Sequence, residues 1–186
     1  MNRSDDAVDR VDGHGRPHPP ERGGEAETLL GFLDYQRATL AWRVSGLDAE
    51  SLAVTVASSA VTLGGLLAHM VFVEEYWCTY WLRGGELGLQ WQSVDWDQDP
   101  DADWHSAATR PPEVLLLEWE RAVETARRNV EEALAQGGLD APTLRVGDQG
   151  EAPSLRWVLV HLIEEYARHN GHADFLREAI DGQVGE

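Results

Sequence analysis

The segment from His161 to Arg177, HLIEEYARHNGHADFLR, constrains the fold of this chain more than any other. Within it, His161, Glu165, His169 and His172 follow one another at offsets of four, four and three. Such offsets place side chains on one face of an α-helix, which turns by about 100° per residue. Burying polar groups without partners is unfavourable. We therefore expect a helix that holds three imidazoles and a carboxylate around a partner, and a metal ion suits these groups.

Helical spacing of apolar residues extends well beyond this segment. It predicts four long helices, at residues 25–45, 62–83, 111–136 and 154–180. Residues 52–56 alternate like a short strand, although they would also suit an extended connection. The pattern favours an all-α fold, a four-helix bundle over residues 25–182 with long crossing loops. Residues 1–24 are rich in Gly, Pro, Asp and Arg, and we expect them to form a disordered tail.

Residues 87–110 form the longest predicted connection, with three tryptophans interleaved among aspartates. Loops of this length in a compact domain are usually functional or poorly ordered. The tryptophans favour a loop that folds back onto the body of the protein, over the mouth of a pocket. A calcium loop of the EF-hand type is excluded, because the central Gly and the distal Glu are missing.

Charge excludes several classes of partner. Fifteen basic residues, all Arg, stand against 33 acidic residues, which gives a net charge of −18. Without a basic run we expect neither nucleic-acid binding nor attachment to an anionic membrane surface. Cys78 is the single cysteine, so an internal disulfide is impossible. The sequence shows neither a signal peptide nor a membrane-spanning run, so we expect a cytoplasmic protein.

The helical wheel separates the four polar residues of the last helix into two pairs. Glu165 and His169 lie toward the apolar side, whereas His161 and His172 lie nearer its edge. A Glu and a His four residues apart can chelate one ion, and His69 is the only other histidine in the middle of a predicted helix. We predict His69, Glu165 and His169 as metal ligands. Zn²⁺ is the first choice, with nickel or iron as alternatives.

Two stretches carry a resemblance to a known family: GLLAH at Gly65–His69 and EYARHNGH at Glu165–His172. They resemble the DinB/YfiT-like superfamily of metal-binding four-helix bundles, over residues 25–182. The superfamily commonly has His-x-x-x-His followed by Arg-Gly-Gln on its last helix. Here Glu165 replaces the first His, and Asn170-Gly171-His172 stands in place of Arg-Gly-Gln.

The Glu is similar to the mycothiol-dependent maleylpyruvate isomerase branch, whose zinc is held by His, Glu and His. This resemblance implies His69, Glu165 and His169 as ligands and a low-molecular-weight thiol, such as mycothiol, as co-substrate. It also implies that two copies can pair through helix faces as a homodimer. The isomerase has a further C-terminal domain, which we do not expect here because the sequence stops at Glu186, so its substrate and reaction are not carried over.

Three functions are compatible with these residues. The leading hypothesis is a metal-dependent enzyme that joins a thiol to a small electrophile, as an S-transferase or isomerase, with His161, His172 or Tyr76 moving protons. A metal-dependent hydrolase would use the same open site. The third is a non-catalytic bundle, stabilised by the metal, that serves binding or stress response. Dependence on a thiol separates the first two, and a fourth protein ligand would favour the third.

Overall fold

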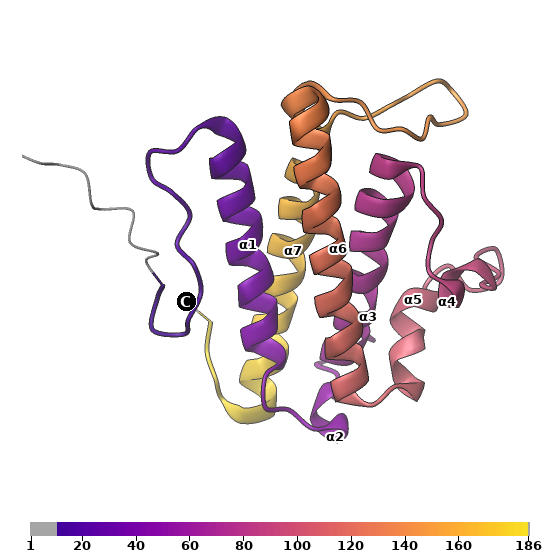
Figure 1. Cartoon of the computed structure of the whole chain (residues 1–186). Helices are drawn as coiled ribbons and strands as arrows, with labels where there is room; N and C mark the ends of the chain where they lie inside the picture. Colours follow the sequence, from indigo (N-terminus) through magenta and orange to yellow (C-terminus); the bar gives the residue numbers. More distant parts are fainter. Residues whose placement is uncertain (1–10, 186) are drawn as a thin grey trace, which may run out of the picture.

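Four long helices lie side by side in the computed structural model, which describes residues 11–185 (Figure 1). They are α1 (Glu25–Val44), α3 (Leu63–Glu74), α6 (Pro112–Gly137) and α7 (Leu155–Asp181). Helix α1 packs chiefly on α7, and α3 packs on α6 and on α7. Residues 11–185 contain no β-strand, only isolated bridges. The predicted all-α bundle is therefore confirmed.

Local capping residues explain why the helices begin and end where they do. The Thr62 side chain accepts a hydrogen bond from the Gly65 amide at 2.9 Å, which caps α3. Ser154 caps α7 in the same way through the Trp157 amide. Gly182 then ends α7 at a φ of 77°, a left-handed conformation that glycine adopts without strain. These are the boundaries that the sequence predicts.

The second predicted helix differs from a regular α-helix in its last third. After α3 the chain continues as a π-helix, η1 (Glu75–Trp81), before it ends at Arg83. A π-turn contains more residues than an α-turn, so side chains beyond it are rotated from the positions given by an α-helical wheel. The regular α-helix predicted at residues 62–83 therefore holds only as far as Glu74.

Between the long helices, the connections contain short helices. Residues 49–52 form α2 (Ala49–Leu52), so the strand-like interpretation of residues 52–56 was wrong. The tryptophan-rich connection contains α4 (Leu89–Gln92), α5 (Ala102–His105) and the 3₁₀ helix η2 (Ser106–Thr109). Trp91, in α4, is buried, so the loop does fold onto the body of the protein. A last 3₁₀ turn, η3 (Gly138–Asp140), follows α6.

Part of the predicted disordered tail has a defined path. Residues 1–10 lie outside the described residues, but residues 11–24 run alongside α1 (Figure 1). The Arg16 guanidinium lies over the rings of Tyr35 and Trp42, at 4.7 and 4.8 Å from their centroids. His14 stacks on Trp42. Aromatic side chains of α1 therefore hold a segment whose composition alone favours disorder.

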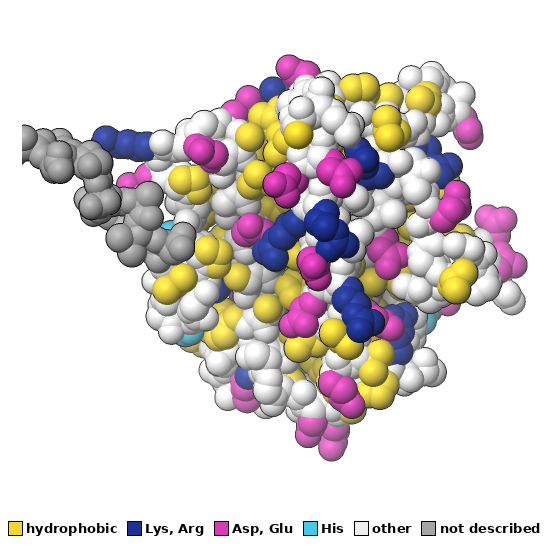
Figure 2. All heavy atoms as spheres, viewed as in Figure 1, with side chains coloured by type: hydrophobic (Ala, Val, Ile, Leu, Met, Phe, Trp, Pro, Cys, Tyr) yellow, Lys and Arg dark blue, Asp and Glu magenta, His cyan; other side chains and the backbone are white. Residues whose placement is uncertain are grey.

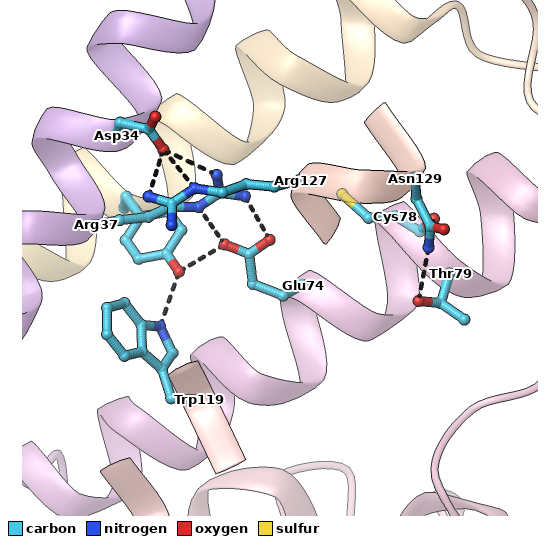
Figure 3. Close-up of polar contacts among 9 residues, drawn as sticks. Asp34, Arg37, Glu74, Cys78, Thr79, Trp119, Arg127 and Asn129 are labelled. Atoms are coloured by element: carbon cyan, nitrogen blue, oxygen red, sulfur yellow. Dashed lines mark hydrogen bonds and ion pairs between the residues drawn. The ribbon is translucent and has the colours of Figure 1, made fainter. Parts of the chain in front are cut away.

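A polar network lies inside the bundle, between α1, α3, α6 and α7 (Figure 3). Arg37 donates two hydrogen bonds of 2.8 Å to the carboxylate of Glu74, which is completely buried. Tyr166 donates to the same carboxylate at 2.7 Å, and Trp119 donates to the Tyr166 hydroxyl. Buried charges persist where hydrogen bonds satisfy them, and this network joins all four helices.

The surface carries the excess of acid that the sequence predicts. In the view of Figure 2, acidic side chains are spread over the visible face, and the basic side chains are interspersed with them. Among the described residues, no helix has the length and apolar character needed to cross a membrane.

Candidate metal centre

Helices α3 and α7 bring three predicted ligands together. His69 comes from α3, whereas Glu165 and His169 lie one turn apart on α7. Their candidate ligand atoms all lie within 4.8 Å of one another. Glu165 Oε2 lies 3.2 Å from His169 Nε2 and 4.0 Å from His69 Nε2. Both imidazoles therefore present Nε2 toward one carboxylate oxygen, which is an arrangement that could surround a single cation.

Asp103, at the middle of α5, fixes the orientation of His69. Its Oδ2 atom lies 2.6 Å from His69 Nδ1, and the residue is only 4% exposed. A carboxylate can only accept, so Nδ1 carries a proton, and in the neutral ring Nε2 has a free lone pair directed at Glu165. A carboxylate behind a histidine is a common support for metal ligands, because it sets the tautomer and the ring orientation.

His169 is the most buried of the three candidate ligands. Burial lowers its pKa to about 3, and the nearby imidazoles of His69 and His172 act in the same direction. The ring is therefore neutral at physiological pH, which is the form that binds a metal. His172 Nδ1 lies 3.4 Å from His169 Nδ1, where it can accept a hydrogen bond from the Nδ1–H of that ring, which leaves Nε2 without a proton.

Contacts with α1 fix the rotation of α7 about its axis next to the site. Asn170 donates hydrogen bonds to the backbone oxygen and the side chain of Gln36. One helical turn farther, Arg43 forms an ion pair with Asp174 at 2.6 Å. The ligand pair on α7 therefore keeps its direction toward α3.

His161 lies on the more open side of the centre. Its Nε2 atom is 3.5 Å from Glu165 Oε1, and its ring stacks on Trp157 and meets the edge of Trp77. His161, Glu164 and Glu165 form a second group that could hold a cation. Glu164 already pairs with Arg168. The group of His69, Glu165 and His169 is therefore the stronger candidate.

Tyr76 lies in the first turn of the π-helical segment η1, and its ring packs on Phe72, Trp77 and Tyr80. The role of Tyr76 in proton transfer therefore remains a prediction.

Trp104 borders the centre at His69 and His169. Its ring stacks on His69, with centroids 4.3 Å apart, and meets the edge of His169. Trp104, His169 and His172 line part of a cavity of about 670 Å³. His69 and Glu165 are not among its lining residues, so the cavity adjoins the centre and does not contain it.

Sequence reasoning missed Asp103 and Trp104 as parts of the site. Both belong to a run in which Asp and Trp alternate, and nothing in that pattern distinguishes them from their neighbours. The general expectation that the loop covers a pocket mouth did point to the correct segment.

The donor set fits a divalent metal ion. Two neutral imidazoles and a carboxylate are the ligands of many catalytic zinc sites, which keep further positions open for water or substrate. The same set suits ferrous iron, so ligand type alone does not choose the metal. The protein's own thiol cannot take part, because Cys78 is completely buried, and this burial raises its pKa.

Comparison with known protein families identifies the family to which the chain is similar. A family model described as mycothiol-S-transferase matches residues 28–182, which lie inside the domain predicted at residues 25–182 and include every candidate ligand. The match supports the prediction that the chain is a member of the DinB/YfiT-like superfamily. No curated protein matches the chain.

Proposed function

The chain belongs to the mycothiol S-transferase family, and on that premise we propose that it is a metal-dependent enzyme that transfers a low-molecular-weight thiol to a small electrophile. The observation that carries this proposal is a group of three donors, His69, Glu165 and His169, beside a cavity. The thiol must come from solution, because Cys78 is buried.

We propose His69, Glu165 and His169 as the ligands, with Zn²⁺ as the resident ion. A bound divalent ion lowers the pKa of a coordinated thiol and so supplies a thiolate at neutral pH. Asp103 and His172 support two of the ligands, each through Nδ1 of the histidine. Their part is to keep Nε2 of both rings directed at the ion.

His161 is the proposed proton acceptor. Its place beside Glu165, on the partly open side, suits a base that takes the proton of an arriving thiol. In the step we propose, the S–H bond breaks and the proton passes to His161. The sulfur then forms a bond to the electrophilic carbon, and the leaving group departs with its electron pair.

The alternatives have less support. A structural metal site is normally closed by four protein ligands, whereas three donors form this group among the described residues. A hydrolase would suit the same open site, but the family is named for thiol transfer.

A direct assay separates these readings. Metal-loaded protein is mixed with mycothiol and monochlorobimane, and conjugate formation is followed by fluorescence. We expect turnover that depends on both the thiol and the metal, and that is lost in His169→Ala. Product formation without the thiol would favour a hydrolase, and no product from the metal-loaded protein would contradict the proposal.

A further inference from the structure

The cavity beside the metal centre is a candidate binding site in its own right. It is bounded by α2, the start of α3, the segment of α5 and η2, the start of α6, and α7. Its volume of about 670 Å³ is within the range of pockets that bind small organic molecules. Five separate segments of the chain contribute to its wall, so the space exists only in the folded bundle.

Small side chains create this space. The wall is mostly apolar and includes two glycines and several alanines: Ala49, Ala53, Ala60, Gly64, Gly65, Ala107 and Ala108. A Cβ atom built on Gly64 would lie 3.3 Å from the Leu52 carbonyl oxygen and 3.7 Å from Ala107 Cβ. Larger residues here would therefore fill the cavity or crowd its wall.

The basic side chains Arg110, Arg168 and His105 of the wall each have an acidic partner. Arg110 forms an ion pair with Glu118, Arg168 with Glu164, and His105 with Asp99. Each acidic partner lies outside the lining and offsets the positive charge. The cavity therefore offers apolar contact without an unpaired cation for an anionic ligand. Asp101, the acidic residue among the lining, is exposed to solvent and would repel an anion as well, so the wall favours an uncharged guest over an anionic one.

The cavity ends at the metal centre. His169, a proposed ligand, forms part of its wall together with Trp104, whose ring stacks on His69. A molecule with its apolar part in the cavity would therefore lie next to the ion that activates the thiol. Such positioning raises the rate of a reaction between two bound molecules.

From these observations we infer that the cavity binds the apolar body of a small, uncharged electrophile, which is the second substrate of the thiol transfer. The inference rests on the function proposed above and adds the class of compound that the enzyme accepts.

An unreactive ligand tests the cavity separately from the reaction. The dissociation constant of a methyl bimane that lacks the chlorine is measured with wild type by fluorescence, and compared with Ala107→Phe, which places a ring in the cavity. Ala135→Phe, at an exposed position of α6, is the matched control. We expect binding to wild type and to the control, and a dissociation constant at least about tenfold higher for Ala107→Phe.

Turnover with monochlorobimane gives the second readout. We expect Ala107→Phe to raise KM for the electrophile at least about tenfold, with bound metal and KM for the thiol unchanged. Equal binding of the unreactive bimane by all three proteins, or no binding to wild type, would overturn the inference. A third outcome is that the wild type binds the unreactive bimane, Ala107→Phe weakens this binding, and neither protein turns over monochlorobimane. This outcome would support the cavity as a binding site for uncharged molecules, and it would contradict only the proposed transferase activity.

Discussion

Asp103 Oδ2 lies 2.6 Å from His69 Nδ1, across 34 residues of sequence. The loop between the second and third long helices therefore reaches back to a proposed metal ligand. Its aspartate fixes the tautomer of His69, while the adjacent Trp104 covers the imidazole ring. The loop thus forms one wall of the metal centre.

Asp103→Asn should weaken metal binding without unfolding the protein. The amide cannot replace the carboxylate as a charged acceptor, and such supporting groups contribute about 10- to 100-fold in metal affinity. Competition with a chromophoric chelator measures the change. Asp97→Asn, at an exposed position of the same loop, removes the same charge and should keep wild-type affinity. Equal affinities for the two variants would show that Asp103 does not support the ligand.

His161→Ala should lower kcat by about 100-fold or more, the usual contribution of a positioned base, while bound metal stays unchanged. The loss should shrink with a thiol of lower pKa, because such a thiol releases its proton without help. Steady-state kinetics with two thiols of different pKa check this. The same loss with both thiols would assign His161 a structural part instead.

Glu74→Leu should destabilise the protein by about 3–5 kcal/mol, because it removes the buried carboxylate that pairs with the Arg37 guanidinium and leaves the more exposed Asp34 as its partner. Arg37→Met with Glu74→Leu removes both charges, so the double variant should lose less than the sum of the single losses. Urea unfolding gives the free energies. Additive losses would show that the two side chains are not coupled.

Glu75→Gln should stabilise the protein at neutral pH. Burial raises the pKa of the Glu75 carboxyl above its ordinary value, so the folded protein holds this proton more tightly than the unfolded chain. The contribution of the Glu75 carboxyl to the free energy of unfolding therefore falls as the pH rises from its pKa in the unfolded chain to its higher pKa in the folded protein. Glutamine has no such dependence and keeps an oxygen that can accept from the Gly88 amide, as Glu75 does at 2.9 Å.

The advantage of Glu75→Gln over wild type should consequently be larger at pH 7 than at pH 4, by urea unfolding at both pH values. Glu131→Gln, at an exposed position of α6, is the control and should show little difference. A stability difference that is independent of pH would contradict the assignment.

Much of the fold could be predicted because its signals are local. Thr62 and Ser154 cap helices within three residues of themselves, and apolar periodicity marks each buried face. The offsets in the last helix likewise brought Glu165 and His169 together on one face. Wherever a single helix determines the geometry, the sequence is sufficient.

The remaining features depend on contacts between distant segments. Asp103 is one of five aspartates at alternate positions, and only the path of the loop brings this one to His69. The π-helical turn after Glu74 was likewise not predicted, because the spacing of apolar residues indicates only a regular α-helix there. The cavity has no sequence signal at all, since its wall comes from five segments.

Metal content measured with the three ligand variants tests the central claim most directly. Protein prepared without chelators is analysed for bound metal by elemental mass spectrometry, as wild type and as His69→Ala, Glu165→Ala and His169→Ala. His18→Ala, outside the site, is the control. We predict one divalent ion, Zn²⁺, per wild-type and control chain, and loss of the ion in each ligand variant. Wild type without metal after loading, or ligand variants that keep it, would contradict the account.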